Sequence, residues 1–171
     1  MRNFVLTLAL ALTGVNVAFA DGIPTAVDPK NEAQPPWTIT VFNDDTRTIQ
    51  SGEVVVWDVA DTDVTSSLRP YVITTTTVDD PWTAGVMASS SCGPGEACTL
   101  IVRGIALVRC ADATDAVGAN TTVGTSAIPG LCGDFTPAAN KTSLGLAIGG
   151  GGGAEYNYIP VFVNIGGITE Q

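Results

Sequence analysis

The chain has 171 residues, of which 45% are hydrophobic and 14% are charged, and its formal net charge at pH 7 is −10. This composition supplies enough apolar material for a compact core, and the acidic excess argues against nucleic acid and anionic membranes as partners, because both repel a negative surface. Histidine is absent, which removes the commonest general base, so we expect no enzymatic activity and no cofactor.

The first 20 residues have the features of a secretory signal. Arg2 supplies a basic start, residues 4–12 are apolar, and Ala18 and Ala20 form the small-residue pattern that signal peptidase recognises. A membrane anchor is the competing interpretation, but the apolar run is shorter than the roughly 20 residues that span a bilayer. We therefore predict cleavage after Ala20, no membrane span after cleavage, and a secreted or cell-surface location, with transit through a periplasm as one route.

Residues 21–36 contain four prolines among polar residues and show no apolar period. Such a sequence is typical of an extended arm that does not pack as a regular element. The arm is either idle or lies across a neighbouring subunit, and the sequence leaves both options open. We expect a single β domain to follow, over residues 37–171.

Runs of alternating or β-branched residues, bounded by Gly, Pro, Asn or Asp, predict a series of strands in the rest of the chain. They occupy residues 37–42, 52–57, 71–78, 84–88, 98–108, 121–123, 144–148 and 156–165. No window of eleven or more residues keeps a helical apolar period after the leader. The spacing predicts an all-β fold, namely a single antiparallel β-barrel or β-sandwich.

An internal repeat with an offset of sixty residues supports this fold. Residues 83–88 recur in similar form as residues 143–148, and each copy leads through a Gly-rich turn into a further strand. We expect both copies to form a similar hairpin. The second turn contains the five-glycine run 149–153, which either moves freely or is ordered by contact with something else.

Three features suggest where another chain would bind. The arm ends in Pro35, Pro36 and Trp37, the predicted strand 71–78 carries a threonine face, and a proline interrupts the last strand. Proline cannot donate a ladder hydrogen bond, so it places that strand at a sheet edge or at a bulge. The candidate assembly residues are Pro35, Pro36, Trp37, Thr74, Thr76 and Pro160.

The four cysteines predict two disulfides, because an even count in an exported chain is typical of a disulfide framework. Three connectivities exist, and we favour Cys92 with Cys98 and Cys110 with Cys132, since these pairs are nearest in sequence. Turn residues between Cys92 and Cys98 allow the chain to reverse there. A zinc site is the alternative, although no paired Cys-x-x-Cys pattern is present.

Several segments together resemble the small β-barrel capsid-decoration-like proteins of tailed phages. The resemblance rests on residues 52–58, 84–88, 95–105, 143–148 and 161–165, and it spans residues 51–165. It implies a compact barrel that trimerises or caps a lattice and performs no chemistry. A signal peptide and paired cysteines depart from that family, because its members assemble in a reducing cytoplasm.

Other residue groups have a chemical and a simpler interpretation. Asp58, Asp61 and Asp63 suit a calcium site but also a solvated turn, and they lack the EF-hand pattern. The carboxylate pairs at 44–45 and 79–80 are conceivable as acid and base. Three serines at 89–91 have no base nearby in the sequence, so we interpret them as a polar loop.

We therefore expect a non-enzymatic, exported structural subunit that self-associates through strand edges and its arm into a filament, coat or surface layer. Its partners would be further copies of the chain, with a lattice or surface as a further partner. The alternative is a secreted carbohydrate-binding module in which Trp37, Trp57 and Trp82 stack on a sugar. Core packing is the simpler interpretation of these tryptophans, because Trp57 ends a strand with a buried pattern.

Overall fold

The computed structural model describes residues 35–60, 69–111, 117–149 and 157–165, and these residues form eleven strands and no helix. The strands are β1 (Trp37–Asn43), β2 (Ile49–Gln50), β3 (Val54–Trp57), β4 (Tyr71–Ile73), β5 (Thr83–Met87), β6 (Ser91–Cys92), β7 (Ala97–Cys110), β8 (Thr122–Thr125), β9 (Cys132–Asp134), β10 (Gly145–Ala147) and β11 (Asn157–Asn164). The all-β prediction is confirmed. Within these ranges there is accordingly no helix that could cross a membrane.

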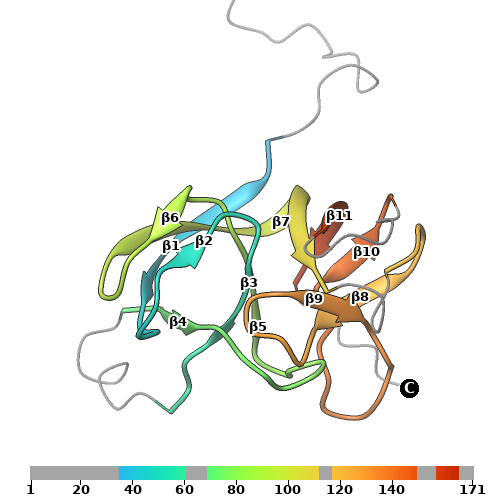
Figure 1. Cartoon of the computed structure of the whole chain (residues 1–171), viewed down its shortest axis with the longest axis horizontal. Coiled ribbons are helices and arrows are strands. Elements are labelled where there is room, and N and C mark those ends of the chain that lie inside the picture. The colour runs from blue at the N-terminus through green and yellow to red at the C-terminus, as the bar shows by residue number, and fades with distance from the viewer. Residues whose placement is uncertain (1–34, 61–68, 112–116, 150–156, 166–171) are drawn as a thin grey trace, which may run out of the picture. The chain divides into compact units, whose positions relative to one another are not determined.

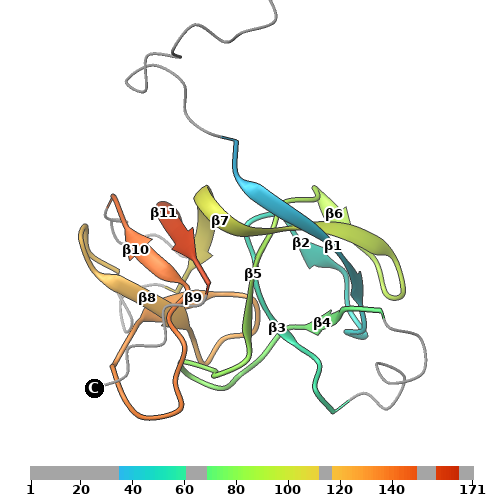
Figure 2. The same cartoon turned by 180° about the vertical axis from the view of Figure 1, so that it is seen from behind.

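Nine strands form two closed rings that share β7. The first ring runs β1-β4-β3-β5-β7 and closes because β7 also pairs with β1. The second runs β7-β11-β10-β8-β9 and closes where Cys110 pairs with Cys132. Figures 1 and 2 show the two groups of strands side by side, with β7 passing from one to the other. The predicted barrel is confirmed, and the second ring is an addition that the sequence did not reveal.

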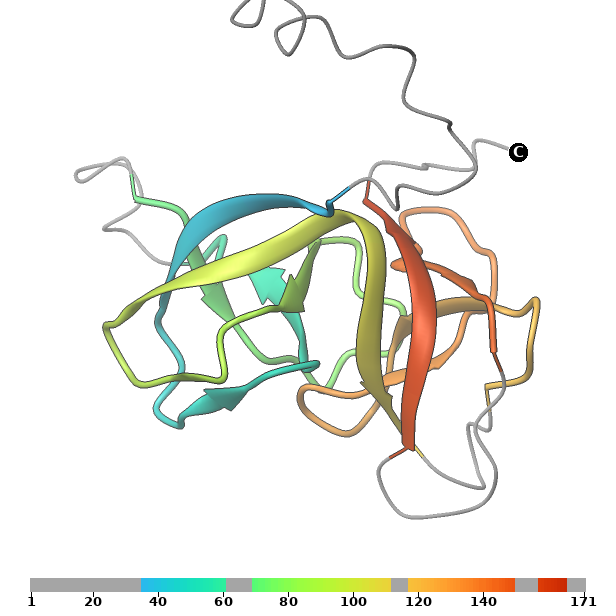
Figure 3. The same ribbon diagram turned by 90° about the horizontal axis from the view of Figure 1, so that it is seen from above.

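The strand β7 serves both rings because it has 14 residues. Its first half pairs with β1 as far as Arg103, and its second half pairs with β11 from Arg103 onward. Between the halves, Gly104 has a φ of 115°, which glycine adopts more readily than other residues. Figure 3 shows that β7 bends between its two halves, so that β1 accompanies one half and β11 the other.

Each ring encloses its own apolar core. The first core consists of Val41, Ile49, Val55, Val72, Ala84, Met87, Cys92, Cys98 and Leu100. The second consists of Val54, Val86, Ala106, Val108, Cys110, Val117, Val123, Cys132, Leu144, Ala147, Ile159, Val161 and Val163. Val54 and Val55 are adjacent but belong to different cores, because successive strand residues point to opposite sides of a sheet. The strand β3 is therefore part of a wall with a core on either side.

The internal repeat corresponds to two similar strand pairs, one in each ring. The strand β5 pairs antiparallel with β7, and β10 pairs antiparallel with β11. A side chain at Gly85 would collide with the carbonyl oxygen of Ile101, and one at Gly145 would collide with that of Phe162. These two glycines, sixty residues apart, therefore let the paired backbones approach closely in both copies.

Two details of the predicted sheet were wrong. The pairs β1–β4 and β7–β9 are parallel, so the barrel is not purely antiparallel. The predicted strand 71–78 ends at Ile73. Its threonine hydroxyls bond to nearby groups instead: Thr75 Oγ1 donates to Asp80 and accepts from the Thr77 amide. Such local bonds compete with a sheet ladder, which explains the early end of β4.

The edge position predicted for Pro160 was also wrong, because β11 lies between β7 and β10. The Pro160 carbonyl accepts a hydrogen bond from the Ile148 amide, just beyond the end of β10 at Ala147. The proline nitrogen faces the same side as its carbonyl, since both point the same way in a strand. The absent N–H of Pro160 therefore removes only one hydrogen bond, to the chain just beyond the end of β10. The hydrogen bonds between β11 and β7 are unaffected.

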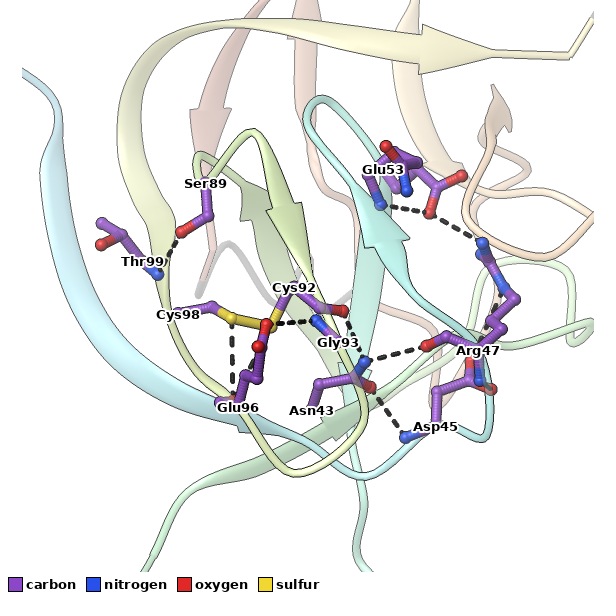
Figure 4. Close-up of a disulfide and its surroundings, with 11 residues drawn as sticks. Asn43, Asp45, Arg47, Glu53, Ser89, Cys92, Gly93, Glu96, Cys98 and Thr99 are labelled. Atoms are coloured by element: carbon purple, nitrogen blue, oxygen red, sulfur yellow. Dashed lines mark hydrogen bonds and ion pairs between the residues drawn. A yellow bond between two sulfur atoms is a disulfide. The ribbon is translucent and has the colours of Figure 1, made fainter.

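Both predicted disulfides are present, and they anchor β7 near its two ends. Cys92–Cys98 holds the turn before β7, and Cys110–Cys132 lies where the second ring closes. The buried Asn43 amide donates to the carbonyls of Cys92, at 2.8 Å, and of Arg47, at 2.9 Å, which ties the first disulfide to the end of β1 (Figure 4). Two disulfides indicate that the protein folds in an oxidising environment.

Removing either disulfide should destabilise the protein, and the second should matter more. The Cys92–Cys98 bridge spans 6 residues and the Cys110–Cys132 bridge spans 22. Loop-closure entropy predicts losses of about 2 kcal/mol for the first and about 3 kcal/mol for the second in the free energy of unfolding. Urea denaturation of the C92A/C98A and C110A/C132A variants measures both values. Equal losses, or the reverse order, would contradict this expectation.

Candidate interaction surface

An array of exposed apolar side chains covers the outer side of the second ring. Ile105 on β7 faces Phe162 on β11, which in turn faces Leu146 on β10. In the next row, Leu107 faces Pro160, whose carbonyl bonds to Ile148. We call this array the apolar face; its members are Ile105, Leu107, Leu146, Ile148, Pro160 and Phe162. All except the half-buried Pro160 are between 41% and 61% exposed.

The apolar face exists because three strands are apolar on both sides. Ala106 and Val108 point into the second core, yet their neighbours Ile105 and Leu107 point outward. An antiparallel strand with one wet side normally alternates apolar with polar residues. A contiguous exposed apolar patch on a folded protein is typical of a surface that contacts another molecule.

The charges around the apolar face are all positive along β7. Arg103 and Arg109 stand at the two ends of its β7 row, and the three strands contribute no carboxylate to it. The Arg103 guanidinium lies 5.1 Å from the centroid of the Trp37 ring. Among the residues that the structure describes, no carboxylate lies within ion-pair distance of Arg103. In an acidic protein, the Arg103 margin of this face therefore carries a local positive charge.

The buried Glu53 fixes Arg109 and, through it, the second half of β7. Its carboxylate accepts a hydrogen bond from Arg109, at 2.7 Å, and forms an ion pair with Arg47, at 3.0 Å. The Arg109 amide donates to the Gly52 carbonyl at 2.8 Å. A side chain at Gly52 would lie 2.8 Å from the Tyr158 ring and 2.9 Å from the Leu107 carbonyl oxygen. Glu53 and Gly52 therefore lie against the Arg109 end of the outward row of β7, next to the apolar face.

The structure brings some of the predicted assembly residues to this face. Pro160 is part of it, and Trp37 lies at its margin beside Arg103. Pro36 packs on the adjoining backbone, since a side chain on Gly104 would lie 2.9 Å from the Pro36 Cα atom, and Pro35 is exposed. The remaining two, Thr74 and Thr76, follow β4 in the first ring.

Thr74 has an intramolecular role. Its hydroxyl and amide both donate to Asp45, whose carboxylate also lies 3.8 Å from the Arg47 side chain. Burial by itself raises the pKa of Asp45, but the Thr74 bonds, the Arg47 amide and the Arg47 charge outweigh it, so the pKa lies below its ordinary value of 3.8. Thr76 is exposed.

The sequence contained a usable signal for the apolar face that our predictions missed. The runs at residues 104–108, 144–148 and 159–163 are apolar at successive positions, without the alternation expected of a half-exposed strand. We counted these residues as ordinary strand residues. The predictions therefore missed Ile105, Leu107, Leu146, Ile148 and Phe162.

The tryptophans do not form one platform for a sugar. Trp57 packs against the first core, as expected, and its amide bonds to the Trp82 carbonyl. Trp57 pairs with β4, and β4 pairs with β1 near Phe42, at the end of β1. Trp37 is at the start of β1, so it lies at the opposite end of that strand from Trp57. Trp37 and Trp82 are exposed at separate places.

The carboxylates considered for chemistry bond to the protein itself. The buried Asp79 accepts from Lys141 at 3.0 Å, and Asp80 accepts from the Trp82 amide at 2.9 Å. Asp58 accepts from the Ala60 amide, as in a polar turn, while the partner positions 61 and 63 of the calcium hypothesis lie outside the described residues. In the parts of the chain that the structure describes, no three acidic or cysteine side chains gather as metal ligands would.

No protein-family model matches the chain, and no curated protein is significantly similar to it in sequence. Among solved structures, the N base of the head fiber gp8.5 of bacteriophage phi29 matches with a TM-score of 0.49 and 9% identity, over 76% of this chain and 95% of that chain.

Replacing Glu53 with glutamine should destabilise the protein strongly. The substitution leaves Arg47 and Arg109 without their shared buried carboxylate, and breaking a buried ion pair costs about 3 kcal/mol. Urea denaturation of E53Q measures the loss. The control is D134N, because Asp134 is exposed on β9. A loss in E53Q no larger than in D134N would contradict this role of Glu53.

The Thr74→Val substitution should give a stability difference that depends on pH. A carboxylate with a lowered pKa stabilises the folded state above the pKa it has when unfolded, and that contribution disappears as the pH falls through the folded pKa. Losing the hydroxyl donor should cost about 1 kcal/mol at pH 7, and wild type and variant should converge as the pH falls through the lowered pKa of Asp45. Denaturation across this pH range measures it; a constant difference would refute the assignment.

Proposed function

We propose that this protein is an exported, non-enzymatic structural subunit that self-associates through its apolar face into an extracellular or virion-type assembly. The carrying observation is the apolar face itself, six side chains in two cross-strand rows on the outside of the second ring. The two disulfides and the predicted leader support an exported protein. We propose that assembly uses this face of the sheet.

Closure of the rings favours a sheet face over a strand edge as the contact. Each strand of the nine-stranded sheet has a hydrogen-bonded neighbour on both sides. Edge pairing, which we had expected from the sequence, needs a row of free backbone donors and acceptors. Packing of exposed side chains needs none, so the apolar face is the better candidate.

A second copy of the chain suits this face by its charge. The chain carries seventeen acidic and seven basic residues, so most of its surface is negative. The apolar face carries no carboxylate, and Arg103 stands at its margin. A negative region of another copy therefore complements this margin, while contacts elsewhere bring like charges together.

Leu107→Lys should weaken self-association at least tenfold. Leu107 is 61% exposed on the β7 side of the apolar face, and burying a leucine side chain contributes about 1.5–3 kcal/mol, where 1.4 kcal/mol corresponds to tenfold. Analytical ultracentrifugation over a range of concentrations measures the dissociation constant. Higher salt should strengthen association of the wild type, because it screens the net charge.

Val59→Lys is the matched control, because Val59 is 58% exposed and follows β3 in the first ring. It adds the same charge at a similar exposure, so it should leave association unchanged. A wild type that stays monomeric from dilute to concentrated solution would refute self-association. Equal effects of both lysines would show that the contact does not use this face.

A further inference from the structure

We infer that residues 21–34 of one copy lie across the apolar face of a neighbouring copy. This inference rests on the proposed function and names the segment that occupies the surface. Three observations carry it: the place where the segment joins the barrel, the chemistry of its residues, and its length.

The segment precedes Pro35 and Pro36, and Pro36 lies beside the apolar face of its own chain. Pro36 packs on Gly104, where β7 bends away from the line of β1 (Figure 3). Before the bend β1 pairs along one side of β7, and after the bend β11 pairs along the same side. The two strands meet at Arg103, which pairs with Trp37 of β1 and with Asn164 of β11. The backbone preceding Pro36 therefore cannot continue along β7 as a further strand.

Two consecutive prolines also oppose an immediate return of the segment to its own face. Proline fixes its own φ, and it restricts the residue before it to extended backbone. Pro35 and Pro36 therefore hold the described backbone just before β1 stiff and extended. A neighbouring copy can receive such a segment without a reversal of the chain.

The residues of the segment match the surface. Ile23 and Val27 are apolar and are interleaved with Pro24 and Pro29, and Pro-rich extended segments bind to apolar, aromatic-containing surfaces. The apolar face includes the Phe162 ring, with Tyr158 on the same strand beside it. The segment carries three carboxylates against one lysine, which complements Arg103 at the margin.

The length of the segment is sufficient for this contact. Fourteen residues in extended form span about 45 Å, while the three strands of the apolar face are each about 4.8 Å apart. The segment can therefore cross the whole face of a neighbour and still bridge a gap between the two barrels.

A complementation experiment with two variants of the full exported chain tests the inference. The face variant carries Leu107→Lys, and the segment variant carries Ile23→Asp and Val27→Asp. Each variant alone should be monomeric at concentrations where the wild type associates. An equimolar mixture should form a 1:1 complex and no larger species, because one chain supplies an intact segment and the other an intact face. Sedimentation velocity with one variant fluorescently labelled measures the complex.

The control for the segment variant carries Thr25→Asp and Asn31→Asp, which add the same charge without removing apolar side chains. It should associate at least tenfold more tightly than the segment variant. Unfolding midpoints equal to that of the wild type establish that the variants are folded.

The other outcomes overturn the inference in distinguishable ways. A segment variant that associates like the wild type shows that the apolar face binds another part of the neighbour, and self-association stands. A segment variant that associates more tightly than the wild type shows that the segment covers the face of its own chain. A mixture that stays monomeric excludes the exchange, and a monomeric wild type removes the proposed function as well.

Discussion

The fold depends on a single strand that belongs to two rings. Without β7 neither ring closes, because β1, β5, β9 and β11 all use it as a neighbour. Its backbone must satisfy partners on both sides over its whole length, which demands a bend between the halves, and Gly104 allows one. The two disulfides then hold β7 at Cys98 and at Cys110. Ring closure, the bend at Gly104 and the two disulfides therefore all serve to keep β7 in place as a strand of both rings.

This constraint also explains where the exposed apolar side chains lie. In the second ring, β7 and β11 supply Ala106, Val108 and Val161 to the core, and strand geometry sends their neighbours outward. On β3 and β5, side chains that point out of the first ring pack into the second core. Val54 and Val86 are examples. No described element covers the outward residues of β7, β10 and β11, which are therefore exposed to solvent or to another molecule.

Local sequence patterns were sufficient for much of this fold. Alternation and β-branched runs located most of the longer strands, and short separations with turn residues identified both disulfides. Ring closure was not accessible, because β1 pairs with β7 across some sixty residues and no local pattern records such a partner. The early end of β4 depends on the side-chain bonds of Thr75 to Asp80 and Thr77, and the place of Pro160 depends on where β10 ends. The apolar face was accessible in principle, since its strands are apolar on both sides, but that pattern also describes a buried strand.

The distribution of charge restricts how such a barrel can associate. A strongly acidic chain repels its copies in most orientations, which opposes random contacts. Apolar contact is favourable in any orientation that buries it, so by itself it does not select one geometry. The combination does select: the face without carboxylates, with Arg103 and Trp37 at one margin, is where repulsion is weakest and apolar burial is greatest. Closed rings leave no strand edge in the nine-stranded sheet to compete with it, which is why the proposed self-association is assigned to this face.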